Sequence, residues 1–171
     1  METITTLQPY SDIYNLHQYP CIGARRQLWI EKVRTIVSHH TPYGITKHVS
    51  LPYAEAVAAT RAALADEGFG VLTEIDVRET FKKKLDADFR PYIILGACNP
   101  PLAHQALSEE TDIGLLLPCN VVVYQGENVD ESVVSAIDPV VQLGVSGKDE
   151  IAPLAEEVKS RLLRVLEAIT G

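Results

Sequence analysis

The stretch YIILGACNPP, residues 92–101, carries the clearest structural pattern in the sequence. Its first seven residues are apolar or small, which is typical of a buried β-strand. Asn99 is a preferred residue at a helix N-terminus, and Pro100 suits the first helical turn. The stretch therefore predicts a strand that leads directly into a helix, which we expect to end near Leu107.

The residues that follow predict two more strands and a final helix. Residues 113–124 are apolar, and we expect a long strand that bulges or breaks at Pro118, because proline has no amide hydrogen to donate. A turn at 126–128 leads back to a strand at 133–137, which predicts an antiparallel hairpin. The helix at about 149–170 has one apolar stripe, formed by Ile151, Leu154, Val158, Leu162, Val165 and Ile169.

The residues before the opening stretch predict the rest of the domain. We expect a short strand at 44–50, a helix at 52–67 that ends at Gly68, and a strand at 69–77. Asp76 and the glutamate three residues later resemble a capping box that opens a short helix. The predicted segments amount to about five strands and three to four helices. The predicted fold class is α+β, with two layers and a mixed sheet.

Composition narrows the classes of partner. The 171 residues carry 15 Lys and Arg against 23 Asp and Glu, which gives a net charge of −8. This charge disfavours nucleic acid or an anionic membrane as the main partner. The longest apolar stretch, 113–124, is too short to span a bilayer, and no signal peptide is visible at the N-terminus. Three cysteines with no short pairing favour the reducing cytoplasm.

Charge usage changes near Pro42. Residues 1–42 have a net charge of +1 and the remainder has −9, so we predict an N-terminal extension (1–42) joined to a compact domain (43–171). Residues 24–40 form an amphipathic helix pattern with Trp29 on its apolar stripe. We expect this helix to pack on the domain or on a second subunit.

The predicted strands also bear on assembly. Strands 92–98 and 113–124 carry apolar residues at both odd and even positions, which predicts that both sheet faces are buried at the centre. The predicted helices can cover one face. A second subunit is the simplest cover for the other, so we predict a homodimer; the alternative is that the N-terminal helix covers it.

Two Cys-Asn steps are the main functional candidates. Cys98 precedes a helix N-terminus, where amide donors and the helix dipole stabilise a thiolate or hold an anionic ligand group. Cys119 follows Pro118, where an irregular strand can direct side chains into a site. The alternative is that both cysteines are small core residues and Asn99 is only a helix cap.

Four segments, FGVLTE (69–74), ILGACNPPLA (94–103), LPCNVVVY (117–124) and DP (138–139), together resemble the Domain of Unknown Function 302 family. The resemblance extends from residue 44 to about 140. It implies a small α+β fold that is usually dimeric and has no agreed activity. It also implies shared positions, which are Cys98, Asn99, Pro100, Pro118, Cys119, Tyr124 and Pro139. Another branch of the family has a basic residue where this chain has Asn120.

Other polar residues are weaker candidates. Glu74 and Asp76 lie on one face of a strand, where paired carboxylates can perform acid–base chemistry or simply face solvent. His104 lies one helical turn after Pro100 and is near enough in sequence to Cys98 to form a Cys–His pair. The alternative is that it is a surface histidine. The lysines at 82–84 are most simply a solvated face.

We expect no metal and no cofactor. His17, Cys21, His39 and His40 lack the spacing of a zinc site, and Gly68-Phe69-Gly70 is not a phosphate-binding loop. The Gly-x-Ser-x-Gly motif of serine hydrolases does not occur in the sequence. The sequence does not establish whether the protein is an enzyme.

The favoured hypothesis is small-molecule binding in a pocket at the strand ends, with or without participation of a thiol. Cys98 is the candidate catalytic residue. The candidate ligand-binding residues are Asn99, His104, Cys119, Asn120, Glu74 and Asp138. The alternative is a homodimeric interaction module with structural cysteines. The pocket hypothesis requires Cys98 and Cys119 to meet around one hollow.

Overall fold

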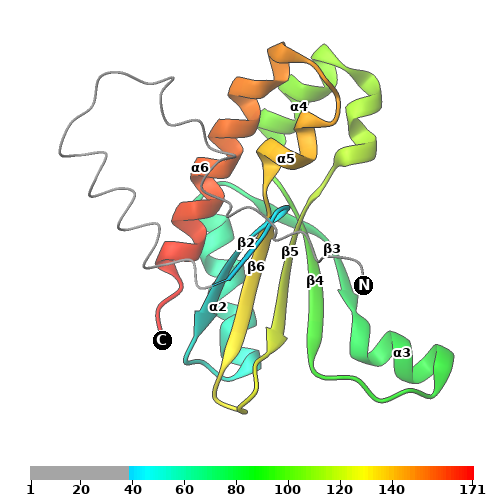
Figure 1. Ribbon diagram of the computed structural model, residues 1–171, viewed down its shortest axis with the longest axis vertical. Coiled ribbons are helices and arrows are strands. Elements are labelled where there is room, and N and C mark those ends of the chain that lie inside the picture. The colour runs from blue at the N-terminus through cyan, green and yellow to red at the C-terminus, as the bar shows by residue number, and fades with distance from the viewer. Residues whose placement is uncertain (1–38) are drawn as a thin grey trace, which may run out of the picture. The chain divides into compact units, whose positions relative to one another are not determined.

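The computed structural model describes residues 39–171, which form an α+β domain with one sheet (Figure 1). The strand order in the sheet is β1-β2-β6-β5-β4-β3. The strands are β1 (His39–Thr41), β2 (Gly44–Val49), β3 (Gly70–Asp76), β4 (Tyr92–Cys98), β5 (Cys119–Gln125) and β6 (Ser132–Ile137). The predicted fold class is confirmed.

The sheet is antiparallel throughout the described chain, so the predicted mixed sheet is wrong. A strand–helix–strand order produces a parallel pair only if the helix crosses back over the sheet to a neighbouring strand. Here the helix after β2 leads to β3 at the opposite end of the strand order, and the other connections reverse the chain direction between neighbours.

Several helix ends coincide with local sequence signals, whereas the helix Pro139–Gly144 was not predicted. The helices are α2 (Tyr53–Asp66), α3 (Val77–Leu85), α4 (Pro100–Glu109), α5 (Pro139–Gly144) and α6 (Ala152–Ala168), with 3₁₀ turns η3 (Thr111–Leu116) and η4 (Asp149–Ile151). Gly68 has φ +79° just after α2, a conformation that favours glycine. The Asp76 carboxylate accepts a 2.8 Å hydrogen bond from the Glu79 amide, so the predicted cap of α3 is confirmed. No described helix is long and apolar enough to cross a membrane.

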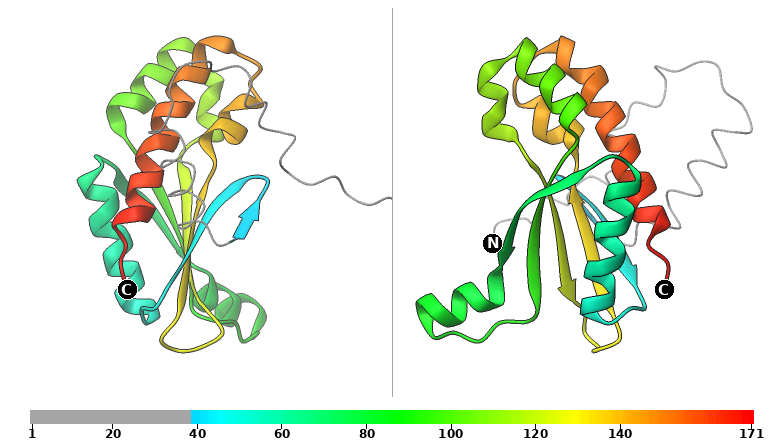
Figure 2. Two further views of the ribbon diagram at one scale, coloured as in Figure 1. Left: turned by 60° about the vertical axis from the view of Figure 1, so that its left-hand side comes forward. Right: turned by 180° about the vertical axis from the view of Figure 1, so that it is seen from behind.

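Two helices, α2 and α6, cover one face of the sheet (Figure 2). The predicted apolar stripe of the last helix is buried along its whole length. Lys47 of β2 points to the same side, and its ammonium donates to the carbonyls of Leu166 and Ile169 at 2.9 and 2.6 Å. This contact ties the end of α6 to the sheet.

The prediction of a strand at 113–117 is wrong, because Thr111–Leu116 is the 3₁₀ turn η3. A short apolar run does not distinguish a buried strand from a buried helical turn. Ile113 is buried in a second apolar cluster beyond the strand ends, with Leu143, Ile151 and Leu154. We call this cluster and the helical segments around it the helical cap. Strand β5 begins only after Pro118, so the predicted break there is confirmed.

The first described residues differ from the prediction of a helix over 24–40. His39 and His40 belong to β1, which pairs with β2 at the edge of the sheet. Their backbone joins the sheet ladder, which excludes a helix that extends to His40. Residues 24–38 of the predicted helix, with Trp29, lie outside the described residues.

Helices α2 and α6 do not cover the second face of the sheet, where α3 contacts strands β3 and β4, and we call it the open face (Figure 2). Ile75 on this face is 49% exposed. Its neighbours across the sheet, Ile94 and Val122, are half-buried. On the same face, Val133 of β6 and Thr46 of β2 are each 4% exposed, so the face is exposed at the edge strand β3 and buried at these positions of β6 and β2. Burial of both faces at the centre of the sheet stays a prediction.

Candidate functional site

Cys98 and Cys119 line one hollow between the sheet and the helical cap. Cys119 lies directly opposite Ala97, the residue before Cys98, in the β4–β5 ladder. The other walls are mainly apolar and include Leu102 and Leu143. The hollow has a volume of about 30 Å³. This is room for about one or two water molecules, whereas small-molecule pockets usually measure about 300–1,000 Å³.

Both cysteines are free thiols in a burial environment that disfavours the thiolate. Burial raises the pKa of the half-buried Cys98 thiol. Burial, and to a lesser extent the charge of Cys98, raise the pKa of Cys119 to about 11. The thiolate is the reactive form of cysteine, so a raised pKa makes both residues poor nucleophiles near neutral pH. The environment therefore favours a structural role over an activated thiol.

Asn99 is the third predicted site residue at this hollow, and its side chain already has structural partners. Its carbonyl oxygen accepts from the Leu102 amide at 3.4 Å, so the predicted N-cap of α4 is confirmed. Its amide nitrogen donates to the Glu67 carbonyl at 3.4 Å. Asn99 thereby connects the start of α4 to the end of α2.

The other predicted site residues lie away from the cysteines. Asn120 is exposed, and because strand side chains alternate it faces the opposite side of the sheet from Cys119. His104 is exposed on α4 and does not line the hollow. Glu74 forms a bidentate ion pair with Arg61 of α2, and this contact lowers the pKa of the Glu74 carboxyl.

Asp138 has a local structural environment of its own. Its carboxylate accepts from the Val140 amide at 3.0 Å and so caps α5. The second oxygen accepts from the Lys159 ammonium of α6 at 2.7 Å. Asp138 is buried, so these two contacts use its carboxylate to hold α5 against α6.

A larger hollow lies at the other end of the sheet, beside the β5–β6 hairpin, and we call it the hairpin hollow. Its volume is about 420 Å³. Tyr124, Val133 and His48 are direct neighbours in register across β5, β6 and β2, so their side chains share the open face. Arg90 and Glu131 also line it.

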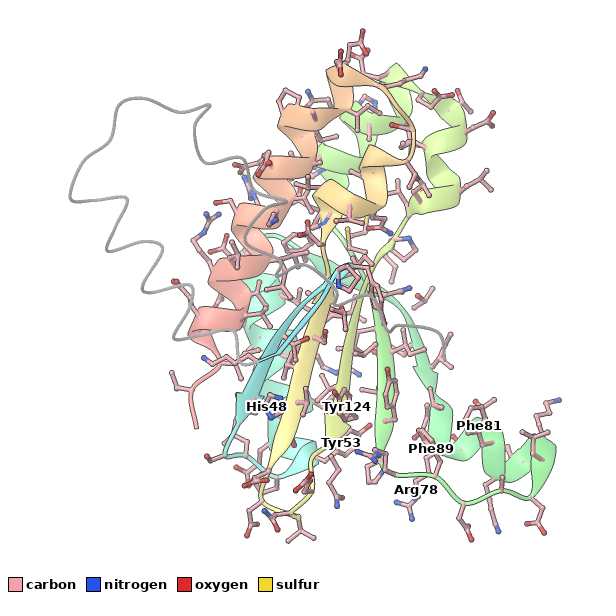
Figure 3. All side chains as sticks on the ribbon, in the orientation of Figure 1. His48, Tyr53, Arg78, Phe81, Phe89 and Tyr124 are labelled. Carbon is pink, nitrogen blue, oxygen red and sulfur yellow. The ribbon has the colours of Figure 1, made fainter. Side chains whose placement is uncertain are left out.

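A row of aromatic rings leads to the hairpin hollow (Figure 3). Tyr92 and Tyr124 are directly opposite in the β4–β5 ladder, and their rings stack with centroids 5.3 Å apart and planes 5° apart. Phe89 lies 6.1 Å from the Tyr92 ring, and Phe81 of α3 lies 5.2 Å from Phe89. The Arg90 guanidinium carbon lies 6.0 Å from the Tyr124 ring centroid, at the limit of a cation–π contact.

No local pattern in the sequence points to this second site. Its residues come from β2, the loop before β4, and the β5–β6 hairpin, which are separated by tens of residues. The one usable signal was the pair of tyrosines, which an antiparallel register of the predicted strands can place side by side. Without the strand order, nothing links His48 to Tyr124.

No group of three or more His, Cys, Asp or Glu side chains within the described part of the chain is placed to hold a metal ion. His17 and Cys21 lie outside the described residues, so the structure does not report on them.

A two-layer α+β domain with an antiparallel sheet and helices on one face is the class that this geometry defines. The family model described as "Domain of unknown function DUF302" matches residues 45–169. The chain therefore belongs to this family, which confirms the resemblance. It is similar to the crystal structure of an uncharacterized conserved DUF302 protein from Bacillus stearothermophilus, with 30% identity and a TM-score of 0.69. The match covers 75% of this chain and 98% of that one. No curated protein matches the sequence.

Proposed function

We propose that this protein binds a small molecule and that the hairpin hollow is the binding site. One observation carries the proposal: this hollow measures about 420 Å³, which is within the usual range for ligand pockets. Its lining combines an aromatic ring, a guanidinium, an imidazole and carboxylates around the apolar Val133. Such a mixture binds the ring of a ligand and orients its polar groups.

The cysteine hollow is less suited to the same role. Its volume of about 30 Å³ leaves no space for a molecule larger than water unless α4 moves away from the sheet. Cys98, Asn99 and Cys119 stay a predicted site that depends on such an opening. A cytoplasmic location also stays a prediction, based on the small number of unpaired cysteines.

The test is a fragment screen on the full-length chain, followed by backbone amide NMR. The probes are a library of neutral, acidic and basic fragments, with and without aromatic rings. We expect binders to shift the amides of residues 48–50 and 124–133. Shifts confined to residues 98–103 would place the ligand at the cysteine hollow instead and overturn the proposal. No shift at either set would overturn both sites.

Homodimer formation through the open face is a second candidate function. It is supported by apolar side chains that the described chain leaves uncovered on this side, among them Ile75 at 49% and Phe89 at 40% exposed. Contiguous exposed apolar surface on a folded domain usually marks an interaction site. Helix α3 extends from the same edge of the sheet and has no buried residue of its own (Figure 1).

Sedimentation equilibrium tests the dimer directly. We expect the wild-type chain to sediment at twice its 18.8 kDa mass and Ile75→Lys to shift toward the monomer at micromolar concentrations. A buried lysine in an apolar interface carries a desolvation cost of several kcal/mol, roughly a hundredfold or more in the dissociation constant. Leu115→Lys is the matched control, because Leu115 is 88% exposed on η3 at the opposite end of the domain. A wild-type monomer, or equal dissociation by both variants, would contradict the candidate.

A further inference from the structure

We infer that the ligand of the hairpin hollow is a planar aromatic acid with a single carboxylate. The inference rests on the proposed function and specifies its ligand class. The ring would stack on Tyr124 and the carboxylate would pair with Arg90. Each part of the ligand follows from a separate feature of the hollow.

The aromatic ring follows from the unfinished stack at Tyr124. The Tyr92 and Tyr124 rings are nearly parallel, and their 5.3 Å centroid separation is close to the roughly 4.8 Å spacing of neighbouring strands. The stack therefore runs across the sheet from strand to strand. The next residue in this direction is Val133, which has no ring, and the one after it is His48.

The space beside Tyr124 has the right width for one more ring. Tyr124 and His48 are two strand spacings apart, which is roughly 9.6 Å at the backbone. Offset-stacked rings prefer centroid separations of about 4.5–7 Å. Val133 itself is 4% exposed, so the ring would lie over the outer surface of its side chain, with Tyr124 on one side and the His48 imidazole on the other.

The carboxylate follows from Arg90, which is exposed and whose remaining N–H donors face solvent. A guanidinium has five N–H donors, and the structure records one hydrogen bond from it, to the Gln125 carbonyl at 3.4 Å. No carboxylate of the described chain lies within ion-pair distance of Arg90. A planar carboxylate matches the guanidinium fork and forms two parallel hydrogen bonds with it.

The limit to one negative charge follows from the hairpin. Glu127 and Glu131 also line the hollow, so its formal charge is −1 when His48 is neutral. A ligand with several negative charges, such as a polyphosphate, would gain one guanidinium and meet two carboxylates. A monocarboxylate directed at Arg90 avoids most of this repulsion.

Four probes separate these features on the full-length chain: indole-3-carboxylate, indole, tryptamine and acetate. We expect indole-3-carboxylate to bind most tightly by NMR titration, up to about fivefold tighter than indole, because a solvent-exposed charge pair contributes at most about 1 kcal/mol. Acetate lacks the ring and tryptamine carries the opposite charge, so both should bind more weakly than indole-3-carboxylate.

Variants assign each contribution to its residue. Arg90→Gln should remove the preference for indole-3-carboxylate over indole, and Tyr124→Leu should weaken both indoles about equally. Arg78→Gln is the matched control, because Arg78 is exposed on α3 and does not line the hollow (Figure 3). It should leave all four affinities unchanged, and an equal loss in Arg78→Gln would overturn the assignment to Arg90.

The outcomes separate the inference from the proposed function. If tryptamine or acetate shifts the amides of residues 124–133 at concentrations as low as indole-3-carboxylate does, the ligand class is wrong and the site stands. If none of the probes shifts them and the fragment screen also finds no binder there, the site itself is wrong.

Discussion

Raising the pH from 9 to 11 is expected to lower the unfolding free energy of the wild-type chain by about 2 kcal/mol more than that of a Cys119→Ala variant. The thiol of Cys119 has a pKa of about 11 in the folded chain, because of burial and the nearby Cys98, and an ordinary value of 9.0 when exposed. Between these two values the unfolded chain loses the proton and the folded chain keeps it. Stability from this group is therefore complete below pH 9 and is lost as the pH rises toward 11.

Chemical denaturation at several pH values measures this effect. Each pKa unit corresponds to about 1.4 kcal/mol, and the difference between the two chains cancels the titration of tyrosines and lysines that they share. Cys98→Ala is the matched control and should change the pH dependence less, because Cys98 is half-buried. Identical pH profiles for wild type and Cys119→Ala would show that Cys119 is accessible to water, contrary to its 6% exposure.

Asp138→Ala is expected to lower the unfolding free energy by about 3 kcal/mol, from the loss of a helix cap and of a buried charge partner together. The substitution removes the acceptor for the Val140 amide at the start of α5. It also removes the carboxylate that accepts from Lys159, whose side chain is 17% exposed. The ammonium thereby loses one charge-assisted hydrogen bond in a largely desolvated position.

Asp138→Asn separates the two contributions, because asparagine retains the capping oxygen and loses the charge. We expect it to be less destabilising than Asp138→Ala in urea denaturation. Asp66→Ala, at an exposed position near the end of α2, should change stability by less than about 0.5 kcal/mol. If Asp138→Ala proved equally harmless, the carboxylate would be free for a ligand, as the sequence analysis predicted.

The local elements were largely predictable because their signals are short-range. Caps at Asp76 and Asn99 and the glycine stop after α2 depend on residues within one helical turn. The apolar stripe of α6 depends only on helical periodicity. Each of these features can be recognised in the sequence because it does not depend on contacts with distant parts of the chain.

The errors concern features that depend on packing partners. Residues 111–116 form a 3₁₀ turn because Ile113 packs into the helical cap, and an apolar run alone is equally compatible with a strand. The sheet is antiparallel because α2 connects β2 to β3 at the opposite end of the strand order, and the other connections reverse the chain direction between neighbouring strands. Ile75 on the open face is 49% exposed, and the sequence could not indicate this because the composition of a strand does not specify what packs on it.

The candidate sites divide in the same way. The Cys-Asn steps directed attention to Cys98 and Cys119, and these residues do line one hollow. Sequence patterns contain no information on its volume, about 30 Å³, or on the burial that raises the pKa of both thiols. The hairpin hollow was missed because its residues are neighbours through strand register alone.

Residues 92–101, with the caps and periodicities around them, were sufficient to predict an α+β domain, and four short segments between residues 69 and 139 were sufficient to indicate its family. Hydrogen bonds and apolar contacts within a few residues specify such features. They can therefore be recognised without knowing how the helices and strands are arranged in the fold. The strand order β2-β6-β5-β4 instead placed His48, Tyr124 and Arg90 around one hollow and left a sheet face open. Long-range pairing sets that arrangement, because the side chains it joins have no local preference for each other.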